Sequence, residues 1–308
     1  MKGILDRKLL FVTGKGGVGK TTVAAAMGLC AARRGKRVLV VEIDTDPAMQ
    51  RLFGSSRIGF DPVQVATNLW ACNLEGRACM QAFVKKTVRS DRVSELILGN
   101  KIVGVFFESA PSVVEAVILD QIAIRTTETT PAYDLVIVDL PASGHAVTFL
   151  RVPRSMAEMV SVGELAGHLR SIDALLSHPD KSGLVLVTLP EEMPTTETIE
   201  LSRNIERRVT TPVCAVVVNA LKDSGIDETD VAWMDEQLGT AEDRDREALR
   251  RLRYGVALAK YWEDEEQEQH HRLRGELGVK LIDTPYVFTR SSEQELVERV
   301  ARRLSEQL

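Results

Sequence analysis

The residues with the clearest chemistry form a glycine-rich run near the start of the chain. Residues 14–21 read Gly-Lys-Gly-Gly-Val-Gly-Lys-Thr and fit the pattern G-x-x-x-x-G-K-[ST]. Glycines let a phosphate chain approach backbone N–H groups closely at the positive end of a helix. Lys20 would supply charge to the β and γ phosphates, and the Thr21 hydroxyl would coordinate Mg²⁺. The expected nucleotide-binding residues are Gly14, Gly16, Gly17, Val18, Gly19, Lys20, Thr21 and Thr22.

Acidic residues follow two apolar runs elsewhere in the chain. Asp139 ends the run Leu-Val-Ile-Val-Asp, and four apolar residues followed by Asp are typical of a carboxylate that helps to hold Mg²⁺. Asp44 and Asp46 follow the apolar run 38–43. Ligands of open α/β sheets bind outside the carboxyl ends of the strands, so we expect one of these two to face the γ-phosphate. Without the glycine-rich loop, Asp139 would indicate only a strand-end turn.

The elements that would position these residues alternate along the chain. Short apolar, β-branched runs are separated by segments of helical periodicity, which predicts an α/β fold with a doubly wound, mostly parallel sheet. Because the runs are almost continuously apolar, we expect both faces of the sheet to be buried. A helix should follow the glycine-rich loop and end at Gly35. The predicted strands span residues 9–13, 38–43, 134–139, 183–188, 213–219 and 279–283.

Two segments depart from this alternation. Residues 70–127 are mostly helical by pattern, with a break at 99–104 and a helix start at Pro111. We expect them to form a helical insertion between the second and third predicted strands, within a single domain that spans residues 1–308. The second segment, residues 226–276, is strongly charged. Its most acidic part, residues 263–271, should lie in a long, solvated helix.

Composition and cysteine content exclude several classes of protein. The net charge of −5 at pH 7 leaves no excess positive charge for the backbone of a nucleic acid, so we expect no nucleic acid partner. The four cysteines form no C-x-x-C pair, which indicates reduced thiols and no zinc or iron–sulfur site. The N-terminus lacks the features of a signal peptide, and no apolar run is long enough to span a bilayer. We therefore expect a cytoplasmic protein without a direct membrane anchor.

Lys15, one position after the first loop glycine, makes the loop resemble the deviant Walker A form KGGVGKT. That form is shared by the arsenite-pump ATPase, the tail-anchored-protein targeting ATPase, the partition and cell-division-positioning ATPases and the nitrogenase iron protein. In this class of P-loop ATPases, the extra lysine reaches across a dimer interface to the partner's nucleotide. The resemblance implies that Lys15 and Lys20 are catalytic, that ATP and Mg²⁺ are the cofactors and that the active form is a dimer.

Two further motifs resemble the arsenite-pump and targeting branch of this class. Asp46-Pro47-Ala48 is similar to its switch I sequence D-P-A, whose Asp positions the attacking water, and this favours Asp46 over Asp44 as a catalytic and metal-binding residue. Residues 139–145, Asp-Leu-Pro-Ala-Ser-Gly-His, are similar to its switch II signature D-T-A-P-T-G-H. Spacing and order agree over residues 8–155.

Weaker similarities to this branch occur in the second half of the chain. Asn219 resembles the residue that recognises adenine. Pro285 and Phe288 belong to the sequence Pro-Tyr-Val-Phe, which resembles the loop that covers the base. Each feature also fits a plainer interpretation, as a polar residue at a strand end and a proline turn.

The resemblance also has departures that narrow the expected partners. The chain has one P-loop, and it lacks the C-x-x-C of the zinc clasp that joins the targeting ATPase dimer. It is most similar to the bacterial anion-transporting-ATPase-like group of single-domain chains, some of which act as paired paralogues. We therefore expect a homodimer or a heterodimer with a paralogue.

The expected function is a switch ATPase in which ATP closes a dimer that binds a protein client and hydrolysis reopens it. The client surface would come from residues 76–127 and 155–177, although ordinary helical core or a dimer interface explains the same apolar residues. The alternatives are a partition- or positioning-type ATPase that acts as a spatial organiser, and a nucleotide-binding assembly subunit of a paralogue pair. The apolar residues concerned are Val103, Phe106, Phe107, Val113, Val114, Val117, Ile118, Ile122, Met156, Met159, Val160 and Leu165.

Overall fold

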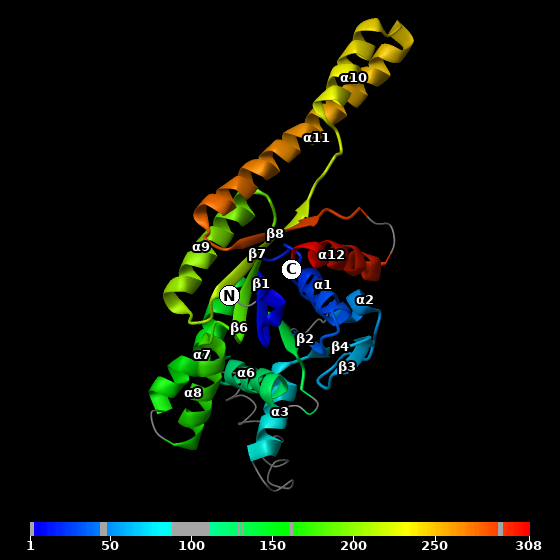
Figure 1. Ribbon diagram of the computed structural model, residues 1–308. Coiled ribbons are helices and arrows are strands. Elements are labelled where there is room, and N and C mark those ends of the chain that lie inside the picture. Colours follow the sequence, from blue (N-terminus) through cyan, green and yellow to red (C-terminus); the bar gives the residue numbers. More distant parts are fainter. Residues whose placement is uncertain are drawn as a thin grey trace.

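The computed structural model describes residues 3–43, 48–87, 111–128, 130, 132–160, 163–288 and 292–308. Within this part of the chain, eight strands form one sheet in the order β3-β4-β2-β5-β1-β6-β7-β8 (Figure 1). Neighbouring strands are parallel except for β3 and β4, which are antiparallel. The α/β fold with a mostly parallel sheet is therefore confirmed. The strands are β1 (Leu9–Gly14), β2 (Val38–Glu42), β3 (Val63–Ala66), β4 (Leu69–Asn73), β5 (Leu135–Asp139), β6 (Ser182–Thr188), β7 (Val213–Leu221) and β8 (Lys280–Pro285).

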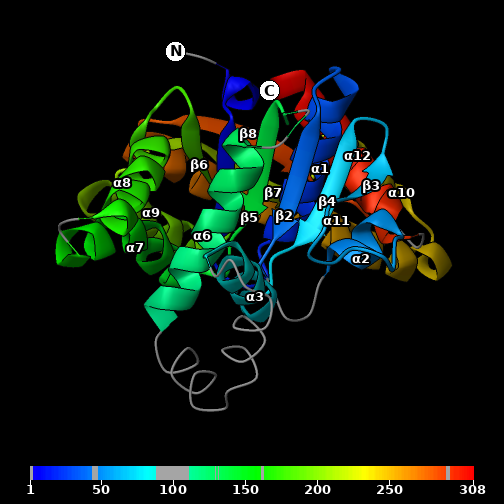
Figure 2. The same ribbon diagram turned by 90° about the horizontal axis from the view of Figure 1, so that it is seen from below.

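Helices cover both faces of the sheet (Figures 1 and 2). One face packs on α1 (Lys20–Arg33), α2 (Met49–Phe53) and α12 (Glu293–Gln307). The opposite face packs on α3 (Gly76–Thr87), α6 (Pro111–Thr127), α7 (Ser143–Val160), α8 (Glu164–Ser177) and α9 (Glu192–Arg208). The remaining elements are a short 3-10 helix (Ile4–Asp6) and the helices α10 (Glu228–Thr240) and α11 (Asp243–Glu276).

Strand β1 is buried on both faces of the sheet, which explains why apolar and polar residues do not alternate along it. Leu9 and Phe11 point into one hydrophobic core, and Leu10 and Val12 point into the other, because successive side chains of a strand face opposite sides of the sheet. All four side chains are fully buried. The predicted burial on both faces is thus confirmed, and both cores lie directly behind the loop that follows β1.

The sequence-based boundaries are close for the six predicted strands, but β3 and β4 were not predicted. The helical pattern assigned from residue 70 is wrong at its start, because residues 69–73 form β4 and pair in parallel with β2. Leu69, Ala71 and Cys72 are buried there, so pairing with an interior strand overrides a weak local pattern. The helix start at Pro111 is confirmed, and the predicted break at 99–104 lies outside the described residues.

The charged segment does form the predicted long helix, α11. The prediction that residues 263–271 are solvated is wrong in part, since Glu266 and Gln269 are buried. Lys222 forms an ion pair with Glu266, with 2.6 Å between Nζ and Oε1, and His270 contacts Asp283. The helix period brings every third or fourth residue of this acidic run against the body of the molecule. No helix among the described residues is long and apolar enough to cross a bilayer.

Candidate nucleotide site

The glycine-rich loop lies between the end of β1 and the start of α1. A side chain at Gly14 would overlap the carbonyl oxygen of Val187 in β6, so this position has to be glycine for the sheet to close. Gly17 and Gly19 have φ angles of 83° and 88°, in the left-handed region that favours glycine. A Cβ at Gly16 would meet nothing within 4 Å. Nothing in the chain itself therefore requires a glycine at position 16, which fits a loop that a phosphate group must approach closely.

Asn219 holds this loop from the neighbouring strand β7. Its side-chain amide donates a hydrogen bond to the carbonyl oxygen of Val18 at 2.8 Å. The Thr284 hydroxyl, in β8, donates to the Asn219 side-chain oxygen at 2.7 Å. A side chain at Gly19 would overlap the Asn219 amide. The structure thus brings Asn219 to the P-loop backbone, and its expected contact with adenine stays a prediction.

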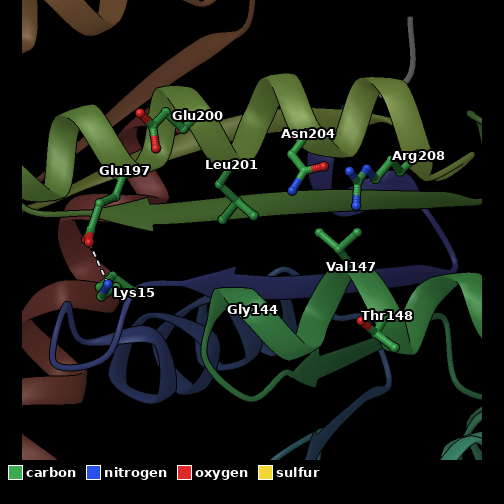
Figure 3. A pocket seen from close by; sticks show the side chains of 9 residues that line it. All are labelled: Lys15, Gly144, Val147, Thr148, Glu197, Glu200, Leu201, Asn204 and Arg208. Carbon is green, nitrogen blue, oxygen red and sulfur yellow. Dashed lines mark hydrogen bonds and ion pairs between the residues drawn. The ribbon is translucent and has the colours of Figure 1, made fainter.

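The two loop lysines lie differently. Lys20 is the first residue of α1, and its Nζ donates to the carbonyl oxygen of Lys15 at 3.0 Å. Lys15 extends away from the loop and pairs with Glu197 of α9, with 2.5 Å between Nζ and Oε1 (Figure 3). About half of the Lys15 side chain is exposed (52%). Lys15 is therefore a surface cation beside the site.

A pocket of about 320 Å³ opens beside Lys15 between α7 and α9 (Figure 3). The ion pair between Lys15 and Glu197 lies at one end of it, and Arg208 lies at the other. Gly144, in the switch II sequence, is on its wall, so the pocket adjoins both the loop and switch II. The lining residues are Lys15, Gly144, Val147, Thr148, Glu197, Glu200, Leu201, Asn204 and Arg208.

Asp139 ends β5, which is the neighbour of both β1 and β2. It is aligned with Val12 of β1 and Glu42 of β2, and only 6% of its surface is exposed. Two contacts tie the following residues to β1: Leu140 N–H donates to Val12 O at 2.9 Å, and the Thr13 hydroxyl donates to Pro141 O at 3.4 Å. Asp139 therefore lies at the same sheet edge as the glycine-rich loop, as predicted.

The switch I acids, Asp44 and Asp46, lie outside the described residues. Glu42, which was not predicted as a site residue, binds the backbone of Ala48 and Met49, where the description of the chain resumes. Its carboxylate is buried and accepts hydrogen bonds from the backbone N–H of Ala48 at 2.7 Å and of Met49 at 3.3 Å. The signal was present in the sequence, because an acid inside the apolar run 38–43 is costly to bury unless it is hydrogen-bonded. Glu42 thus anchors the far end of the switch I sequence.

The residues expected to cover the base lie at the end of β8. Pro285 is the last residue of that strand, and the N–H of Tyr286 donates to Leu221 O at 2.7 Å. Phe288 is 74% exposed. An exposed aromatic ring is available to stack on a base. The expected cover over the base stays a prediction.

The four cysteines are free thiols. Cys30, Cys72 and Cys79 are buried, and Cys214 is half-buried. Burial raises the pKa of Cys72 to about 11 and that of Cys79 to about 12. Thiols with such pKa values stay protonated near neutral pH and are poor nucleophiles. Among the described residues, no three acidic, histidine or cysteine side chains come together as a metal site of their own.

Comparison with known proteins finds relatives that are named as ATPases. The chain is 28% identical to ATPase BagA of Mycobacterium tuberculosis over 242 residues, which cover 73% of this chain and 68% of that protein. It is 30% identical to the ATPase ASNA1 homolog of Entamoeba dispar over 174 residues, which cover 53% of each chain. It is 28% identical to ATPase ASNA1 homolog 1 of Paramecium tetraurelia over 169 residues, which cover 51% of this chain and 47% of that protein.

The model of one protein family matches the part of the chain that builds the site. This family is described as anion-transporting ATPase, and its match spans residues 7–167, slightly more than half of the chain. The matched range includes the glycine-rich loop, both switch sequences and the strands β1, β2 and β5 that position them. The chain therefore belongs to the anion-transporting ATPase family and is an ATPase.

Proposed function

We propose that this ATPase is a switch in which Mg²⁺-ATP closes a dimer and hydrolysis reopens it. The observation that carries the proposal is the position of Lys15, whose ammonium group points away from its own loop and contacts Glu197 at the surface. A half-exposed cation beside a phosphate site can reach the phosphates of a second subunit once two such surfaces meet. It would then add positive charge where negative charge develops during phosphoryl transfer.

The other residues divide the work within one subunit. Lys20 and the loop N–H groups bind the phosphates, and Asp46 orients the attacking water. Thr21, Asp46 and Asp139 would hold Mg²⁺, which neutralises phosphate charge. Asn219 keeps the loop in shape through Val18, and Pro285 and Phe288 cover the base. Because the reacting groups come from a rigid sheet edge, small movements of the switch sequences can change the site.

A protein client would bind at the end of α7 and the start of α8. Val117, Ile118 and Ile122 of α6 are buried in the sheet core, which supports the core interpretation for these residues. Met159 is 84% exposed, and Val160 and Leu165 nearby are also exposed. Exposed methionine and aliphatic side chains form adaptable binding surfaces. Since α7 begins at switch II, a change at the phosphate site would be transmitted directly to this surface.

Two variants separate the roles of Asp46 and Lys15. Asp46→Asn should keep ATP binding while hydrolysis slows by several orders of magnitude, because the water is no longer oriented. Lys15→Ala should also bind ATP nearly normally, yet fail to close the dimer and to hydrolyse ATP. Calorimetry measures binding, and phosphate release measures turnover. Lys181→Ala, an exposed lysine remote from the loop, is the matched control.

Mixing the two variants tests whether Lys15 acts across the dimer. In a mixed dimer, the site on the Lys15→Ala chain has its own Asp46 and receives an intact Lys15 from the other chain. Equal mixing should restore about a quarter of the parental activity, since half of the dimers are mixed and each has one competent site. If mixed dimers form and no activity returns, Lys15 serves its own subunit and the proposed mechanism is wrong.

A further inference from the structure

Helix α10 and the first part of α11 form an arm, residues 227–262, that projects from the body of the molecule (Figure 1). Helix α11 has 34 residues and is therefore about 51 Å long, at about 1.5 Å per residue. Its second half packs on α9 and places Leu273 in the sheet core. Glu266 fixes the base of the arm by accepting the backbone N–H of Lys222 at 2.8 Å in addition to pairing with its side chain. The arm is thus held firmly at one end.

The arm has almost no core of its own. Among its described side chains, only Met234 and Val256 are buried apolar residues, and neither belongs to the two cores of the sheet. Helices in proteins owe most of their stability to burial of an apolar face. Two helices with one fully buried apolar side chain each have little of that stabilisation, so the arm needs a further surface to pack on.

The apolar surface of the arm is instead exposed. Tyr254 and Tyr261 are seven residues apart, so they lie on one face of α11 two turns from each other. Exposed tryptophan and tyrosine side chains supply much of the binding energy at protein interfaces. The large exposed apolar residues of the arm are Trp233, Leu252, Tyr254, Tyr261 and Trp262.

Charge is separated between the two helices of the arm. Residues 227–243 contain seven acidic and no basic side chains, whereas residues 244–262 contain six basic and two acidic ones. Asp235 and Arg253 pair within the arm at 2.6 Å. Glu228, Glu236 and Arg250 are exposed and have no ion-pair partner among the described residues. Exposed charges of both signs, without an ion-pair partner among the described residues, therefore remain on the arm.

We infer that the arm binds the arm of a second copy of this chain, with the acidic part of each facing the basic part of the other. A two-fold axis would relate the two copies, so each contact between an acidic and a basic part would occur twice in the dimer. The whole arm carries more acidic than basic residues, which disfavours nucleic acid and anionic lipid as the occupant. This contact needs no nucleotide, and it is additional to the ATP-driven closure proposed above.

A charge exchange tests the inference without changing the internal Asp235–Arg253 pair. One variant is Arg250→Glu, and the other combines Glu228→Lys with Glu236→Lys. Each alone should be a monomer in sedimentation experiments without nucleotide, because like charges then meet at both contacts. An equal mixture should form dimers, because each altered patch faces an opposite charge in the other variant. Far-UV circular dichroism and thermal unfolding check that each variant is folded.

The aromatic residues supply a second readout. Tyr254→Ser and Tyr261→Ser should each raise the dimer dissociation constant about tenfold, as for interface residues that contribute more than about 1 kcal/mol. Lys181→Ser, an exposed residue beside the start of β1 and outside the arm, should leave the dissociation constant unchanged.

The outcome also distinguishes this contact from the proposed nucleotide switch. Lys20→Ala should still dimerise through the arm although its nucleotide site is damaged. A parent chain that is monomeric without nucleotide, or charge variants that fail to associate when mixed, would overturn the inference. A dimer that forms only with ATP and is lost in Lys20→Ala would also overturn it while leaving the switch proposal standing.

Discussion

Glu42 offers a direct test of how switch I is held. Its buried carboxylate accepts the N–H of Ala48 at 2.7 Å and of Met49 at 3.3 Å, so Glu42→Ala leaves these two donors without that acceptor. Hydrogen bonds to a charged group contribute about 1.5–3 kcal/mol, and we expect the free energy of unfolding to fall by about 2–3 kcal/mol. Because Ala48 follows Asp46 by two residues, kcat should fall about a hundredfold, as for other displacements of about 1 Å in a reacting group.

The assay combines urea unfolding, ATP calorimetry and phosphate release on three variants. Glu42→Gln keeps one acceptor oxygen without the charge, and it should lie between the parent and Glu42→Ala in both stability and kcat. Glu75→Ala is the matched control, because Glu75 is an exposed acid just beyond the neighbouring strand β4, where a change within about 0.5 kcal/mol is expected. Since Lys20 and the loop are untouched, ATP affinity should stay close to that of the parent. Loss of stability with an unchanged kcat would refute the link between Glu42 and switch I.

Three further predictions concern the phosphate site and the thiols. Lys20→Ala should abolish nucleotide binding, because the phosphates lose a charge-assisted contact, and calorimetry with undiminished ATP affinity would contradict the site assignment. Asp139→Asn should mainly weaken the dependence of turnover on Mg²⁺, and superimposable Mg²⁺ titrations of variant and parent would show that Asp139 has been misassigned. Cys72 and Cys79 should resist iodoacetamide at pH 8 until the chain is unfolded, since burial raises their thiol pKa values to about 11 and about 12. Rapid labelling of either one in the native protein, seen by mass spectrometry, would contradict their burial.

The strands at the centre of the sheet could be predicted because they are buried on both faces. β1, β2 and β5 each begin with four consecutive apolar residues, and each ends at a residue of the site. β3 is only partly buried at the edge of the sheet, and its four residues carry no such signal. β4 is buried, but it follows β3 after the tight turn at Asn68, whose φ of 60° is not visible as a pattern in the sequence. The sequence pattern therefore does not predict short strands whose formation depends on pairing with neighbouring strands.

The candidate site could be predicted where chemistry fixes both residue type and spacing. The loop glycines, Lys20 and Asp139 satisfy a local rule, and the structure brings them to one edge of the sheet. Thr284 acts on the site through the side chain of Asn219, 65 positions away, so no local rule marks it. Glu42 was missed although an acid within an apolar run is a local signal, because the motifs do not include it. The ion pair between Lys15 and Glu197 joins residues 182 positions apart, which only the packing of α9 against the sheet brings together.

Strand β7 joins the nucleotide loop to the base of the arm through a strained residue. Ala220 has a φ of 61°, a conformation that costs a residue with a side chain about 1–2 kcal/mol and persists only where its surroundings determine it. Asn219 on one side bonds to Val18, and Lys222 on the other side bonds to Glu266 of α11. These contacts fix the backbone on both sides of Ala220, which offsets the strain. A movement of the arm would therefore displace Lys222 first. The constrained backbone at Ala220 would then displace Asn219, whose side-chain amide bonds to Val18 in the P-loop. This two-sided attachment is the physical basis on which arm contact and nucleotide affinity could be coupled, and by reciprocity ATP would then change arm affinity by the same factor.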